Sequence, residues 1–138
     1  MPHELRLAVI SAPPLGHAAR VMTALTALCD LVDFHADVFV PRSINAFKHF
    51  PLPNVSVHEI RCPTRDWLSQ GETFAAELSA RGVPNSYDLL ILDTNPVQWL
   101  YLVDTQTVPS VFITNAFLAR PSPTLTLQEI YFRKNHFA

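Results

Sequence analysis

Asp88-Leu89-Leu90-Ile91-Leu92-Asp93 is the clearest indicator of fold class in this chain of 138 residues. Four consecutive apolar residues between two carboxylates are typical of a strand buried on both faces, as in the centre of a parallel sheet. Neighbouring parallel strands are joined by crossover connections, which are usually helices. The segments on either side of 88–93 should therefore alternate between strand and helix.

The rest of the chain follows that alternation. Short apolar runs predict further strands at 5–12, 34–40, 55–60 and 108–114. Apolar residues spaced by three and four positions predict helices between the strands, at 21–32, 43–50, 65–81 and 97–105. Gly82, directly after the helix expected at 65–81, predicts the end of that helix. Cys29 shares the apolar face of the first helix, so we expect it in the core.

This order of elements predicts an α/β protein with a Rossmann-like, doubly wound parallel sheet between two helical layers. Right-handed crossovers favour the strand order 3-2-1-4-5, with the first and fourth strands adjacent at the centre. The length fits one such domain, expected at 1–119. The tail at 120–138, which contains Pro121 and Pro123, is expected to be a helical docking or linker segment.

Composition excludes several classes of function. The net charge is −2 and the basic residues are scattered, which argues against a nucleic-acid partner. No apolar run approaches the roughly 18 residues of a membrane span, and the first residues do not resemble a secretory leader, so we expect a cytoplasmic protein without a transmembrane segment. Cys29 and Cys62 fit no metal or redox spacing, so no metal is expected.

A site is expected where the strand order reverses, outside the carboxyl ends of the first and fourth strands. Gly16 and His17 follow the first strand, and Asp93 ends the fourth. A histidine there can act as a general base near neutral pH, and a neighbouring aspartate can orient it. The alternative is structural: His17 caps a helix and Asp93 only ends a strand.

The order of these segments resembles the N-terminal, acceptor-binding half of GT-B glycosyltransferases, especially the UDP-glycosyltransferase-like branch. The similar segments are the first strand running into Gly16-His17, Asp37-Val38-Phe39-Val40-Pro41, Tyr87 to Asp93, and Val108-Pro109 leading into the strand that ends near Asn115. The likeness covers residues 5–118. The chain departs from it in having Pro13-Pro14-Leu15 where the lipid-linked branch has paired glycines.

The resemblance implies an inverting, nucleotide-sugar-dependent transfer in which His17 is the catalytic base and Asp93 orients it. It also implies a set of acceptor-binding residues, namely Gly16, Asn95, Trp99, Asn115 and Phe117. No cofactor is expected on the chain itself, because the nucleotide-sugar donor of this family binds mainly to a second domain. The expected partners are a sugar or small-molecule acceptor and a donor-binding domain or subunit, or a second copy of the chain.

Other readings of the same fold remain. A non-catalytic Rossmann-like binding or assembly module is the main alternative, with the apolar residues of 127–137 as a docking surface. A phosphoacceptor receiver domain needs acidic residues after the first strand, where this chain has Ser11-Ala12. An α/β-hydrolase needs a Gly-x-Ser-x-Gly elbow, and a dinucleotide-binding domain needs a Gly-x-Gly-x-x-Gly turn. The chain has neither motif.

Overall fold

The computed structural model describes residues 4–61, 67–83, 85–93 and 108–113. Within them, five strands form one sheet in the order β3-β2-β1-β4-β5, and every neighbouring pair is parallel. The strands are β1 (Leu5–Ile10), β2 (Phe34–Pro41), β3 (Val55–Ile60), β4 (Leu89–Asp93) and β5 (Ser110–Ile113). The predicted strand order is confirmed, including the central β1–β4 pair.

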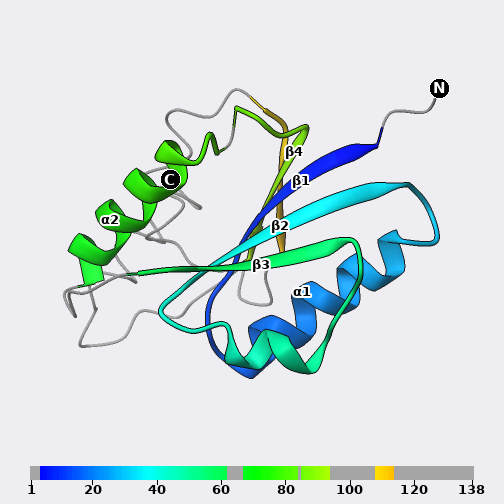
Figure 1. Cartoon of the computed structure of the whole chain (residues 1–138), viewed down its shortest axis with the longest axis horizontal. Helices are drawn as coiled ribbons and strands as arrows, with labels where there is room; N and C mark the ends of the chain where they lie inside the picture. The colour runs from blue at the N-terminus through cyan, green and yellow to red at the C-terminus, as the bar shows by residue number, and fades with distance from the viewer. Residues whose placement is uncertain (1–3, 62–66, 84, 94–107, 114–138) are drawn as a thin grey trace, which may run out of the picture.

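Helices cover both faces of this sheet. One face carries α1 (Leu15–Leu28) and the short 3-10 helix η1 (Asn45–His49), and the other carries α2 (Trp67–Ala80). In Figure 1, α1 and α2 lie on opposite sides of the strands. The described part of the chain is therefore a three-layer α/β unit, as the alternation of elements predicted.

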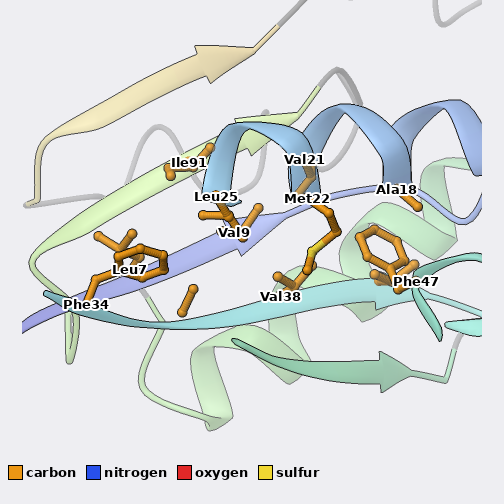
Figure 2. Packing of buried hydrophobic residues seen from close by; sticks show 12 residues of the cluster. Leu7, Val9, Ala18, Val21, Met22, Leu25, Phe34, Val38, Phe47 and Ile91 are labelled. Carbon is orange, nitrogen blue, oxygen red and sulfur yellow. The ribbon is translucent and has the colours of Figure 1, made fainter. Parts of the chain in front are cut away.

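The core is divided by the sheet into two apolar clusters. Leu7 and Val9 of β1 point toward α1, whereas Ala8 and Ile10 point toward α2, because successive side chains of a strand alternate between faces. Figure 2 shows Val21, Met22 and Leu25 of α1 packed over Leu7, Val9 and Val38 of the sheet. Fully burying one such side chain contributes about 1.5–3 kcal/mol, so these two clusters dominate the stability of the fold.

The β4 strand is buried on both of its faces. Ile91 belongs to the cluster under α1, and Leu90 and Leu92 belong to the cluster under α2. Pairing of β4 with β1 on one side and β5 on the other leaves it no free edge. This is the environment that its unbroken apolar sequence predicted.

The first helix begins earlier than its apolar periodicity indicated. It starts at Leu15, directly after Pro14, whose φ of −60° and ψ of 150° place it as the residue before the helix. The amide N–H groups of His17 and Ala18 donate to the Pro14 carbonyl. Gly16 and His17 thus lie in the first turn of α1.

The prediction that Cys29 lies in the core is wrong. The helix ends at Leu28, and the Cys29 thiol is exposed, with its sulfur 3.7 Å from the side-chain nitrogen of Asn54. The Cys29 backbone is still helical, with φ of −56° and ψ of −29°, and its N–H donates to the Leu25 carbonyl. The helical periodicity therefore holds as far as Cys29, but at this end of α1 its side chain lies beside Asn54, which precedes β3, and not among the apolar side chains of the core.

The glycine stop after α2 is confirmed. Gly82 has a φ of +79°, a left-handed conformation that glycine adopts without strain, and the Val83 N–H donates to the Leu78 carbonyl across it. The predicted helix at 97–105 and the tail at 120–138 lie outside the described residues. Of the helices that are described, none has the length and apolar character needed to cross a membrane.

Candidate active site at the carboxyl ends of β1 and β4

The candidate site forms where β1 and β4 end beside each other under the start of α1. Ile10 of β1 is paired with Leu92 of β4, so the residues that follow them, Ser11 and Asp93, come side by side. Both are fully buried. His17 and Arg20 extend toward them from the first turns of α1, and each keeps about a quarter of its side chain exposed.

His17 and Asp93 are in direct contact. The Nδ1 atom of His17 lies 2.9 Å from Oδ2 of Asp93, across 76 positions of sequence. The expectation that the fold brings these two side chains within hydrogen-bond distance is confirmed. Their catalytic role stays a prediction.

The Asp93 carboxylate is saturated with partners. Its Oδ1 accepts hydrogen bonds from Nε and Nη2 of Arg20, at 2.9 and 2.6 Å. Its Oδ2 accepts a hydrogen bond from the Ser11 hydroxyl at 2.8 Å and faces His17. A carboxylate offers about four acceptor positions, and all four are engaged here. Such complete pairing is what makes a buried carboxylate tolerable, and it leaves Asp93 no capacity to bind a ligand directly.

The contact with Asp93 favours a proton on Nδ1 of His17, whereas the guanidinium nitrogen of Arg20, 3.1 Å from the same atom, can only donate and favours a lone pair there. A deprotonated Nδ1 would turn its lone pair toward a carboxylate lone pair at 2.9 Å, which is repulsive, whereas Nδ1–H donates to Oδ2. Neutral His17 then carries its lone pair on Nε2. Among the described residues, the hydrogen bonds of His17 go to Nδ1, so Nε2 is the ring nitrogen that can accept a proton from a bound molecule.

Sequence reasoning missed Arg20 and Ser11. Arg20 lies three positions after His17, and residues at that spacing share one face of a helix. The helical pattern therefore carried a signal for Arg20. The parallel topology also brings Ser11 near Asp93, but nothing in the sequence indicates that the hydroxyl of a serine at a strand end is turned toward that carboxylate.

The other predicted site residues are not gathered here. Gly16 lies one residue before His17 in α1, and a Cβ added to it would meet no atom within 4 Å, so packing does not require glycine there. Asn95, Trp99, Asn115 and Phe117 lie outside the described residues. The described part of the chain also contains no group of three side chains suited to hold a metal ion.

A second polar cluster lies on the opposite face of the sheet. Asp37 of β2 accepts a 2.9 Å hydrogen bond from the Tyr87 hydroxyl, and its Oδ1 lies 2.8 Å from Nε2 of His58 and 3.4 Å from Nε2 of His35. The Arg6 guanidinium stacks over the Tyr87 ring, 5.1 Å from its centre. This cluster ties β1, β2 and β3 to the segment before β4.

Both acidic groups of that cluster have shifted pKa values. Burial alone would raise the pKa of Asp37, but the hydrogen bonds from His58 and Tyr87 and the charge of the nearby imidazoles outweigh it and lower the pKa. Burial, followed by the hydrogen bond to Asp37 and its negative charge, raises the pKa of Tyr87 to about 12. Tyr87 is therefore a donor to an ionised Asp37 at neutral pH.

Comparison with known proteins finds similarity in structure only. No family model and no curated protein matches the chain. The glycotransferase of kitacinnamycin matches with a TM-score of 0.56 and 14% identity, over 80% of this chain and 30% of that chain. TcCGT1, solved in complex with UDP, matches with a TM-score of 0.51 and 13% identity, over 80% of this chain and 28% of that chain.

These similarities show a glycosyltransferase-like Rossmann fold. The chain spans only about 30% of the length of the two solved structures, so the activity of either whole protein is not carried over with the fold.

Proposed function

We propose that this chain is the acceptor-binding part of an inverting, nucleotide-sugar-dependent glycosyltransferase, and that it acts together with a donor-binding domain or subunit. The observation that carries the proposal is the 2.9 Å contact between His17 Nδ1 and the buried Asp93 carboxylate. The fold shared with the glycotransferase of kitacinnamycin and with TcCGT1, which was solved in complex with UDP, supports it.

In the proposed reaction, His17 Nε2 takes the proton of an acceptor hydroxyl. The acceptor oxygen forms a bond to the anomeric carbon of the donor sugar, on the face opposite the diphosphate. The bond between that carbon and the diphosphate oxygen breaks, and the nucleoside diphosphate leaves with the bonding electrons. Asp93 keeps the imidazole in the Nδ1–H form and interacts favourably with the imidazolium that results.

Acceptor binding by Gly16, Asn95, Trp99, Asn115 and Phe117 belongs to the same proposal. UDP is the nucleotide bound in the TcCGT1 structure, so uridine diphosphate sugars are the first donors to test.

The test measures nucleoside diphosphate release from UDP-sugars by this chain combined with a glycosyltransferase donor-binding domain. Replacing His17 by Ala should lower turnover by about 10² to 10⁴, the usual contribution of a general base. His49→Ala is the matched control, because His49 is exposed on η1 and has no contact with Asp93. If His17→Ala and His49→Ala give the same turnover as the unaltered chain, His17 is not the base.

A non-catalytic binding or assembly module is the second candidate function. A groove of about 430 Å³ between α1 and the segment after η1 favours it, because apolar side chains such as Met22, Phe50 and Leu52 line it. His17 does not line this groove. If the chain is such a module, His17→Ala should change its stability and should not change the turnover measured with a donor-binding domain.

A further inference from the structure

Arg20 contacts both members of the His17–Asp93 pair. Its Nε and Nη2 donate to Oδ1 of Asp93, and the same Nη2 lies 3.1 Å from Nδ1 of His17. The charged groups that contact His17 from the described elements are thus Asp93 on β4 and Arg20 on α1. Ser11, which follows β1 and also binds Asp93, is neutral.

The Nδ1 atom of His17 cannot satisfy both neighbours. A ring nitrogen makes one hydrogen bond in the plane of the ring, either as a donor through its N–H or as an acceptor through its lone pair. Donation suits the carboxylate oxygen at 2.9 Å and leaves Nδ1–H facing a guanidinium nitrogen at 3.1 Å. The N–H groups of His17 and Arg20 are then both donors at short distance. Their repulsion increases when His17 gains a second proton and becomes a cation.

We propose that Arg20 is a positioning residue that turns Oδ2 of Asp93 toward His17 and also offsets the attraction between Asp93 and protonated His17. The first effect follows from the two hydrogen bonds to Oδ1, which leave only Oδ2 for His17 and Ser11. The second follows from distance, since an oxygen of the Asp93 carboxylate and a nitrogen of the Arg20 guanidinium lie 2.9 and 3.1 Å from the same Nδ1, and their opposite charges act against each other on the imidazolium.

This inference rests on the proposed function where it concerns catalysis. The pair differs from a histidine and an aspartate alone, in which the carboxylate charge favours imidazolium without opposition. With Arg20 present, a positive charge opposes that effect at the same ring nitrogen. The protonated state that follows proton abstraction is correspondingly less stable.

The test is a nitrogen-15 NMR titration of the histidines in the full chain, without donor or acceptor. The sequence has six histidines, and the spectrum of His17→Gln assigns the His17 signals. Arg20→Gln removes the charge and keeps donor groups, and we expect it to move the titration midpoint of His17 to higher pH, by about one pH unit or more. Arg20→Lys keeps a charge without the two-donor contact and should give a smaller displacement.

Two further variants complete a double-mutant cycle, in which the charges of Arg20 and Asp93 are removed separately and together. Asp93→Asn should move the His17 midpoint to lower pH, because Arg20 then acts unopposed. The double variant Arg20→Gln/Asp93→Asn should return it close to that of the unaltered chain. This double variant leaves no unpaired buried charge, so it decides the question even if a single variant fails to fold. Lys48→Gln removes one positive charge on exposed η1 and should leave the midpoint unchanged.

An unchanged or lowered midpoint in Arg20→Gln would overturn the inference, as would a double variant that titrates at much lower pH than the unaltered chain. The nitrogen-15 chemical shifts of neutral His17 show which ring nitrogen carries the proton, and this tests the proposed function separately. If the unaltered chain carries its neutral proton on Nε2, then Nε2 cannot be the base and the proposed reaction fails. The midpoints would still decide the role of Arg20.

Discussion

The hydroxyl of Ser11 donates a 2.8 Å hydrogen bond to Oδ2 of Asp93, although the two residues lie 82 positions apart in the chain. Both side chains are fully buried, at adjacent carboxyl ends of β1 and β4. Ser11 thus shares with His17 the one carboxylate oxygen that Arg20 does not contact. Ser11 therefore helps to hold Oδ2 of Asp93 in place, although Ser11 takes no part in the proposed reaction.

Replacing Ser11 by Ala should lower the free energy of unfolding by about 1–3 kcal/mol, because a buried acceptor loses one of its donors. Urea unfolding of the chain measures this loss. Ser79→Ala on the exposed side of α2 is the matched control, and it should change the free energy of unfolding by no more than about 0.5 kcal/mol. Equal stability of the two variants would show that Ser11 contributes nothing to holding Asp93.

The lowered pKa of Asp37 predicts a loss of stability in acid. Because the folded-state pKa lies below the ordinary value of 3.8, the stabilisation is fully present above that value and is lost as the pH falls through the lowered one. Asp37→Asn should therefore lower the free energy of unfolding at neutral pH and flatten its decline below about pH 4. The exposed Asp30→Asn serves as the control, and an acid decline equally steep in both variants would contradict the prediction.

The raised pKa of Tyr87 predicts a loss of stability in alkali. Since its pKa is about 12 in the folded chain, the stabilisation is present below the ordinary value of 10.0 and is lost as the pH rises through the folded value. Ultraviolet titration of phenolate formation, with Tyr87→Phe to isolate its signal, measures the shift. Asp37→Asn should bring the pKa of Tyr87 down toward 10.0, and an unchanged value would assign the whole shift to burial.

The chain by itself should not bind nucleoside diphosphate sugars at micromolar concentration. It has three glycines and no cluster of basic residues, so a glycine-rich diphosphate loop is missing from the sequence, and Pro13 and Pro14 remove backbone donors before α1. Calorimetric titration with uridine, guanosine and thymidine diphosphate sugars tests this. Micromolar binding of any of them would place a donor site within these 138 residues and contradict the need for a donor-binding partner.

Much of the fold was predictable because the signals are local. The apolar run at 89–92 requires burial on both faces, and the alternation of strands and helices leaves few ways to connect parallel strands. Both features depend only on neighbouring residues and on general rules of chain geometry. The strand order β3-β2-β1-β4-β5 and the end of α2 before Gly82 follow from them, as the structure confirms.

The proximity of His17 and Asp93 was predictable for a different reason. The parallel topology places the ends of β1 and β4 at one edge of the sheet, so two residues 76 positions apart could be assigned to one site before any contact was known. The location of the site follows from topology. The contacts within it do not.

The class of fold, the order of its strands and the edge of the sheet where His17 and Asp93 lie could all be predicted from the amino-acid sequence. Three features could be seen only in the folded chain: Arg20 and Ser11 bind Asp93, Tyr87 and His58 bind Asp37, and Cys29 is exposed. Periodicity records which face of an element is apolar. Hydrogen bonds between distant side chains depend instead on rotamers and helix ends to within a few tenths of an ångström, which the packing of α1 and the strands against one another sets.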